Sequence, residues 1–390
     1  MNYFILFYFI ILLVDPSGLI LHMKIPLTGL VFILILFKIK KIKYSKDLVL
    51  YMSLLILIQL ISLTIGELYF VNPDYQNYQR IGTIIFFILV SFMLQIIGYN
   101  IVIIFIVSIN FLALFGIGSF IFFMLYPDLF MLYYPQFKDI LHISYRELGG
   151  IKYSAIYLGT SEILIFNLYY YLFKEKASFA DNTLFLINMI ALILSGTRVN
   201  IFVAMVIFLL YLYKKYKLML LVLSGIILPF IFSDILPFLN SAVSLSNQSN
   251  SKKIGYFDTY SIYFDKIKYL FFGQGIQNPF NNEQFTTELV YMEIFRMYGL
   301  LFGMVMMILL LLPLFQIKKI DKGNKFIYLS YLTYLIMNLV NPSLFTSQGM
   351  ILYAIMVYCF LYLHKNKNYH YSLTRRTKTN ILKKGYIYEN

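Results

Sequence analysis

Long uninterrupted apolar runs dominate the chain. Residues 81–98 (IGTIIFFILVSFMLQIIG) and 101–126 contain no charged side chain. About 18 such residues, wound as a helix, are enough to cross the roughly 30 Å hydrocarbon core of a bilayer. The runs do not alternate between apolar and polar residues over about ten positions, as the strands of a membrane barrel do. Because only helices and closed barrels satisfy their backbone in lipid, the pattern predicts an all-α polytopic membrane protein.

We expect about twelve transmembrane helices from this pattern. The predicted spans are 3–21, 25–38, 47–67, 81–98, 101–126, 151–173, 183–196, 199–213, 218–238, 289–316, 325–341 and 349–364. The first run has no basic segment before it and no small-residue cleavage site, so it is predicted to be a retained helix. The chain thus divides into spans one to nine (1–238), a large external loop (239–288), spans ten to twelve (289–364) and a basic tail (365–390).

Composition and charge agree with lipid as the solvent. Hydrophobic residues make up 60% of the chain and charged residues 13%, whereas a soluble domain has about a quarter charged residues. Most of the 32 basic residues gather in alternate loops, at 38–46, 174–176, 214–217 and 318–325, and in the tail. Basic loops stay in the cytoplasm, so both termini are predicted to be cytoplasmic. The net charge of +14 is therefore a topology signal and does not indicate nucleic-acid binding.

Candidate cofactor chemistry is sparse. The one cysteine, Cys359, lies in the last predicted span, and the four histidines are scattered without paired spacing. No disulfide framework, protein-built metal site or nucleotide-binding fingerprint is expected.

The predicted external loop is more informative. Its front is polar, and its back half carries an apolar face at helical spacing, formed by Tyr256, Tyr260, Tyr263, Phe264, Ile267, Leu270 and Phe271. This predicts an amphipathic helix at the outer membrane surface or over a cavity, ended by Gly273-Gln274-Gly275.

Several charged residues lie at or near predicted outer helix ends, where topology does not explain them. The basic ones are Arg80, Arg146, Lys152, Arg198 and Arg296, and the acids are Glu67, Glu162, Asp234, Glu288 and Glu293. A single arginine there can simply anchor its helix at the interface, and Arg146 can be solvated in its loop. Arg296 lies about two turns inside its span, where a lipid-facing charge is costly. It either pairs with Glu293 inside the bundle or binds an anion in a water-filled cavity.

Three segments together resemble the O-antigen polymerase and O-antigen ligase superfamily. They are "LSGTRVN" at the end of a short span, "FGQG" at the end of the external loop helix, and "TELVYMEIFRMYGLLFG" entering the next helix. The resemblance covers roughly residues 183–316. Ligases of the superfamily carry a histidine where this chain has Glu288, so the polymerase branch is favoured. The loop helix of the family often begins with arginine, and the nearest basic residues here are Lys252 and Lys253.

The resemblance implies a glycosyl transfer at the outer leaflet of a bacterial inner membrane. A glycan on undecaprenyl diphosphate, of O-antigen, capsule or exopolysaccharide type, would move onto a new lipid-linked repeat unit. Glu288 would be the base and Arg296 a catalytic residue. Arg198 and Arg296, with Arg80 as a third candidate, would hold the diphosphate, and Lys252, Lys253 and Arg146 are candidate loop contacts. No cofactor is required, and a chain-length regulator is a candidate partner.

Other functions stay open at this point. A lipid-linked oligosaccharide flippase has a similar number of spans, although it should show short loops and repeated halves. An O-antigen ligase and a non-catalytic exporter subunit are further alternatives. The sugars and their linkage are not readable from the sequence.

Overall fold

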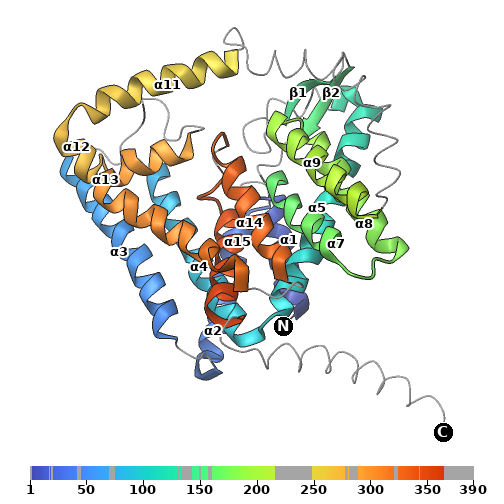
Figure 1. The fold of residues 1–390 in the computed structure, drawn as a ribbon, viewed down its shortest axis with the longest axis horizontal. Coiled ribbons are helices and arrows are strands. Elements are labelled where there is room, and N and C mark those ends of the chain that lie inside the picture. Colours follow the sequence, from blue (N-terminus) through green and yellow to red (C-terminus); the bar gives the residue numbers. More distant parts are fainter. Residues whose placement is uncertain are drawn as a thin grey trace.

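The computed structural model describes most of the helical part of the chain. The described residues are 2–16, 18, 21–41, 45–69, 75–129, 132, 143–148, 151–156, 160–215, 248–276, 280, 289–319, 324–341 and 343–363. Nearly all of the described secondary structure is helical (Figure 1). The helices, in chain order, are α1 (Asn2–Val14), α2 (Lys24–Phe37), α3 (Lys46–Tyr69), α4 (Tyr75–Ile97), α5 (Asn100–Leu125), α7 (Leu164–Phe173), α8 (Phe179–Leu194), α9 (Arg198–Lys215), α11 (Gln248–Phe264), α12 (Ile267–Phe272), α13 (Val290–Leu311), α14 (Lys325–Met337) and α15 (Ser347–Tyr358).

Three of these helices are long and apolar enough to cross a membrane, namely Lys46–Tyr69, Asn100–Leu125 and Val290–Phe315. Six shorter helices of 10–17 residues are also apolar. The fold is therefore that of a helical protein of membrane type. The count of about twelve spans stays a prediction, since a helix of about 13 residues reaches only about 20 Å. The predicted span 218–238 lies outside the described residues.

The sixth predicted span, 151–173, is wrong in its first part. Residues Ile151–Ile156 form strand β2, which pairs antiparallel with β1 (Ile143–Leu148) in a two-stranded hairpin. The register places Arg146 opposite Tyr153. Helical structure begins only at Ser161–Ile163, a short 3-10 turn that continues into α7. The sequence around Gly149-Gly150, with β-branched and aromatic residues on both sides, is typical of a hairpin, a pattern that apolar content alone does not reveal.

The first predicted span, 3–21, is also too long. Helix α1 ends at Val14, and the carboxylate of Asp15 accepts hydrogen bonds from the backbone N–H groups of Gly18 (2.9 Å) and Leu21 (2.8 Å). Asp15 thus organises the turn that follows the helix, and Pro16 cannot donate to a continuing helix.

The core lies around α15, all of whose residues up to Val357 are buried. Figure 1 shows α14 and α15 in the middle of the molecule, and α15 packs against α4, α14 and α1. A chain of ring contacts joins the neighbouring helices: the centroids of Phe9 and Phe105 are 5.7 Å apart, those of Phe105 and Phe166 are 5.3 Å apart, and those of Phe166 and Phe326 are 5.3 Å apart. These contacts connect α1, α5, α7 and α14 into one body.

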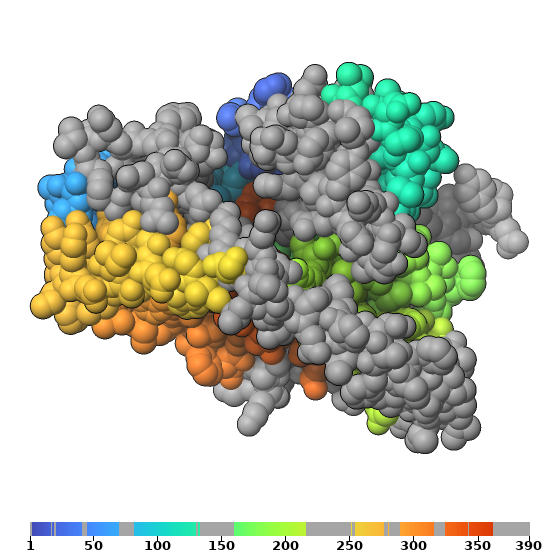
Figure 2. Space-filling model, turned by 90° about the horizontal axis from the view of Figure 1, so that it is seen from above, coloured from blue at the N-terminus to red at the C-terminus, as the bar shows by residue number. Residues whose placement is uncertain are grey.

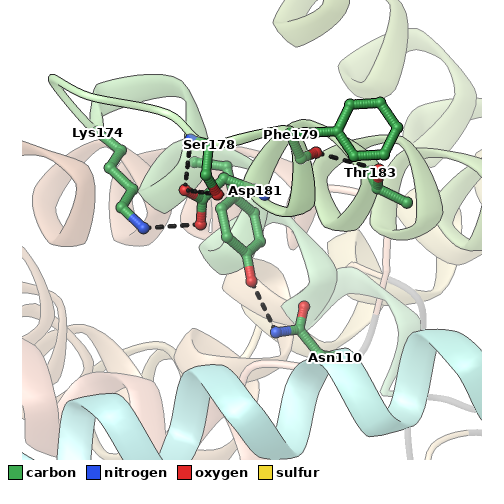
Figure 3. Close-up of polar contacts among 7 residues, drawn as sticks. Asn110, Lys174, Ser178, Phe179, Asp181 and Thr183 are labelled. Carbon is green, nitrogen blue, oxygen red and sulfur yellow. Dashed lines mark hydrogen bonds and ion pairs between the residues drawn. The ribbon is translucent and has the colours of Figure 1, made fainter.

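The turn between α7 and α8 is fixed by a capping box. Lys174 Nζ donates to Asp181 Oδ1 at 2.7 Å, and both the N–H and the hydroxyl of Ser178 donate to Oδ2 (Figure 3). The hydroxyl oxygen of Ser178 in turn accepts from the N–H of Asp181. This reciprocal pairing satisfies groups that are otherwise left open at a helix start.

Acid is expected to weaken this cap. Burial alone would raise the pKa of Asp181, but the hydrogen bonds from Lys174 and Ser178 outweigh it, so the pKa lies below its ordinary value. A carboxylate with a lowered folded-state pKa stabilises the fold above its unfolded pKa, and this contribution is lost as pH falls through the folded pKa. Asp181→Asn should cost about 0.5–2 kcal/mol near neutral pH. Thermal unfolding in detergent should show the gap from wild type closing below about pH 4, and a gap independent of pH would contradict the assignment.

Candidate functional site

The loop helix predicted from the sequence is present, but it is broken in two. Helix α11 ends at Phe264, the extended backbone of Lys266 interrupts it, and α12 follows. In α11 the predicted apolar face is confirmed, since Tyr256 and Tyr260 are buried in a small cluster with Phe280 and Leu289. After the break it is not, because Ile267 is 74% exposed. Figure 2 shows α11 on the surface along one edge of the molecule, next to α13.

Helix α13 bends sharply where the glycine turn after α12 meets it. Gly299 has φ 67° and ψ −178°, which interrupts the helix, and Figure 1 shows α13 as two segments of different direction. The carbonyl groups of Arg296 and Met297 accept from the backbone N–H groups of Gln274 (2.7 Å) and Gly275 (3.1 Å). The hydroxyl of Ser62 in α3 also donates to Met297 O, at 2.9 Å. Carbonyls released by the break are thus satisfied by the turn and by α3.

The approach of these backbones requires glycine. A Cβ at Gly273 would lie 2.5 Å from Gly299 N, and a Cβ at Gly275 would lie 2.3 Å from Gly66 Cα. Gly273 and Gly275 both have positive φ, at 78° and 84°. The glycines of the "FGQG" segment therefore serve close packing against α13 and α3, besides ending α12.

Arg296 lies at the centre of this junction and is 1% exposed. Its Nε and Nη2 donate to the two carboxylate oxygens of Glu293, at 2.8 and 2.5 Å, and its Nη1 donates to Gln274 Oε1 at 3.2 Å. The hydroxyl of Tyr260 in α11 donates to Glu293 Oε2 at 3.0 Å. Of the two alternatives for Arg296 in the sequence, the structure has the pair with Glu293. The guanidinium does not face an open cavity in this conformation, so its bonds connect α13 to α11 and to the glycine turn.

A second buried polar cluster forms where four turns meet at one end of the bundle. Thr160 Oγ1 donates to Leu13 O at 3.0 Å, and Gln348 Nε2 donates to Leu12 O at 3.4 Å. These contacts bring the turns after α1, before α7 and before α15 together. The predicted topology places the turns after α1 and before α15 on the outer side, whereas it expects residues 160–163 inside the sixth span. We call this group, with the turn between α8 and α9, the outer-turn cluster.

Glu162 occupies the middle of the outer-turn cluster and is 1% exposed. The Ser343 hydroxyl donates to Glu162 Oε2 and also lies 3.0 Å from Asn338 Oδ1. Next to Glu162, Ser161 Oγ is 3.5 Å from Asn200 Nδ2, which donates to Ser195 Oγ at 2.8 Å. The sequence places Glu162 mid-span as a hydrogen-bonding partner inside the bundle. Its partner Ser343 could not be named, because it is 181 residues away along the chain.

Arg198 belongs to the outer-turn cluster through its own turn. It is the first residue of α9, it is half-buried, and it lies two residues before the buried Asn200. Gly196, with φ 71°, makes the tight connection from α8. In Figure 1, α9 and α13 lie on opposite sides of α14 and α15. No described contact brings Arg198 and Arg296 together as the two sides of one clamp.

The remaining predicted residues are described only in part or not at all. Glu288 lies outside the described residues. Arg80 lies in α4, Arg146 in β1, and Lys252 and Lys253 in α11, but their side chains are outside the described part of the chain. Sequence reasoning missed Tyr260 and Gln274 as partners of the Arg296 pair. Tyr260 lies on the apolar face of α11 and Gln274 lies in the glycine turn. In the sequence these positions predict packing and give no sign of a hydrogen bond to Arg296 or Glu293.

An apolar groove lies beside the Arg296 junction. Its volume is about 150 Å³, and it is lined by Phe264, Leu270, Phe295 and Leu300. Leu300 is also the first of three exposed residues spaced one helical turn apart on α13, with Met304 and Ile308. The groove therefore continues onto a helix face of the kind that contacts lipid tails.

No known protein family, curated protein or solved structure matches this chain.

Proposed function

We propose that the chain is a membrane glycosyltransferase that polymerises oligosaccharide repeat units at the outer leaflet. It would transfer the growing glycan from undecaprenyl diphosphate to a sugar hydroxyl of a new lipid-linked unit. The product would be an O-antigen, capsule or exopolysaccharide. The donor is already activated as a diphosphate ester, so the protein must chiefly neutralise developing charge and assist one proton transfer.

One observation supports this proposal most directly. Two of the three segments on which the resemblance rests, "FGQG" and "EIFRMYGLLFG", are separated by residues 276–292 and contact each other directly. Gln274 and Gly275 bond to the backbone of Arg296 and Met297, and Gly273 packs on Gly299. The contact does more than support the bend of α13. It also holds α11 and α12 against α13, and residues of these three helices line the apolar groove.

The proposed roles follow from the surroundings of each residue. Arg198 lies at the positive end of the α9 dipole, where a diphosphate is favoured, and its planar guanidinium suits phosphate oxygens. The groove lined by Phe264, Leu270, Phe295 and Leu300 would hold part of the prenyl tail. Arg296, whose guanidinium is occupied by Glu293 and Gln274, would position the loop helix and would not bind the diphosphate itself.

Deletion of the gene tests the function. A polymerase predicts that surface polysaccharide is lost while lipid-linked single repeats are still displayed, as seen on gels of surface glycans. Undiminished polymer would refute the proposal, and a strain that displays no repeat at all would favour the flippase alternative.

Arg198→Ala should reproduce the deletion phenotype at a normal protein level, because the diphosphate loses its charged partner. Arg198→Lys should restore part of the polymer, since it keeps the charge but not the bidentate geometry. The matched control is Lys215→Ala at the other end of the same helix, which should leave the polymer unchanged. A normal polymer in Arg198→Ala would remove Arg198 from the proposed site.

A further inference from the structure

The outer-turn cluster contains an unusual concentration of buried polar atoms that lack a hydrogen-bond partner. Among the described residues these include Thr197 Oγ1, Asn200 Oδ1, Asn341 Nδ2, Ser347 Oγ and Gln348 Oε1. Asn200, Ser347 and Gln348 are each at most 3% exposed. Buried polar groups in folded proteins are nearly always paired, because an unpaired one costs about 1–3 kcal/mol. Several of them, in two turns that both contact the segment Ser161–Ile163, favour a site for a polar molecule.

The two turns that carry these atoms both contact the segment of Glu162. Asn200 is tied through its Nδ2 to Ser161, the residue before Glu162, so its free Oδ1 lies beside the same turn. Ser347 and Gln348 begin α15, one turn after Ser343, whose hydroxyl contacts the Glu162 carboxylate. Thr197 immediately precedes Arg198 in the turn that contributes Asn200.

The chemistry of the unpaired atoms suits a sugar. Asn200 Oδ1 and Gln348 Oε1 can only accept, Asn341 Nδ2 can only donate, and the Thr197 and Ser347 hydroxyls can do both. A sugar hydroxyl also donates and accepts, so neighbouring hydroxyls of one ring can satisfy such a mixed set. A carboxylate among them can accept the proton of the hydroxyl that reacts.

We propose that the outer-turn cluster is the acceptor-sugar site and that Glu162, in place of Glu288, is the catalytic base. This assignment rests on the proposed glycan polymerase function. The acceptor hydroxyl oxygen attacks the anomeric carbon of the donor sugar, and its proton passes to the Glu162 carboxylate. The bond between that carbon and the diphosphate oxygen breaks, and its electron pair leaves with undecaprenyl diphosphate, next to Arg198.

The test compares variants in the deletion strain. Glu162→Gln should lower surface polymer by at least about 100-fold, with single repeats still displayed and a normal amount of protein in the membrane. Asp181→Asn is the matched control, because it also replaces a carboxylate by an amide, but in the capping box between α7 and α8, and it should retain polymer. Glu288→Gln should also retain polymer. Normal polymer in Glu162→Gln, or its loss in Glu288→Gln alone, would overturn the assignment.

Two further comparisons separate the remaining readings. If Glu162→Gln does not accumulate, Glu162→Asp decides, since it keeps the charge and shifts the carboxylate by one methylene. A tenfold loss of polymer in the folded Asp variant supports the base, and undiminished polymer overturns it.

Purified protein with a lipid-linked repeat unit is also assayed in sodium and in choline chloride. Activity that requires sodium in wild type, with a higher sodium concentration needed in Glu162→Asp, would make the cluster a cation site and overturn the proposal. Failure of the polymerase function itself would show separately, as normal polymer in the deletion strain.

Discussion

Arg296→Ala is expected to destabilise the folded protein by about 3–5 kcal/mol, because it leaves the buried carboxylate of Glu293 without its cation. Arg296 is 1% exposed and Glu293 4% exposed, so water cannot replace the lost partner without opening the junction. The same substitution removes the link to Gln274 in the glycine turn. Thermal unfolding in detergent and limited proteolysis of the loop should both show the loss, with α11 cleaved earlier than in wild type.

A neutral double replacement separates positioning from phosphate binding at Arg296. Glu293→Leu combined with Arg296→Met removes both charges at similar volume and should recover most of the stability lost in the single variant. If Arg296 only positions the loop helix, the double variant should also recover polymer. A stable double variant with no polymer would instead place the guanidinium on the substrate, as the sequence first suggested.

Much of the helical layout could be predicted from apolar runs alone. The expected spans 25–38, 47–67 and 101–126 coincide within a few residues with α2, α3 and α5. The bounds of these helices are predicted well, because no residue inside the three apolar runs favours another structure. The errors fall where local chemistry overrides hydropathy: the Asp15 carboxylate closes a turn inside one run, and a hairpin replaces the start of another at 151–156.

The candidate site was less predictable, because it depends on contacts between distant turns. The pair of Glu293 and Arg296 followed from helical spacing, but its partners Tyr260 and Gln274 lie on other elements. Glu162 appeared as an isolated acid in an apolar segment. Only the fold brings Ser343 to it from the other end of the sequence. Spacing along one helix is readable in a sequence, whereas the meeting of four turns is not.

Gly275→Ala is expected to destabilise the docked loop by at least about 2 kcal/mol. The residue has φ 84°, which L side chains rarely adopt, and its new Cβ would lie 2.3 Å from both Cα and N of Gly66 in α3. Both are backbone atoms, so no side chain can rotate away, and either α3 or the turn must move. Because Gly275 N–H bonds to Met297 O, that movement should also loosen the bend of α13 and lower polymer yield.

Gly255→Ala is the matched control for Gly275→Ala. Gly255 lies inside α11, and a Cβ there would meet nothing within 4 Å. Alanine favours a helix by about 1 kcal/mol over glycine, so this variant should unfold at a slightly higher temperature than wild type and keep its polymer. The two melting temperatures should therefore move in opposite directions. If Gly275→Ala melts like wild type, the turn does not pack on α3 as the structure has it, and the bend at Gly299 needs another cause.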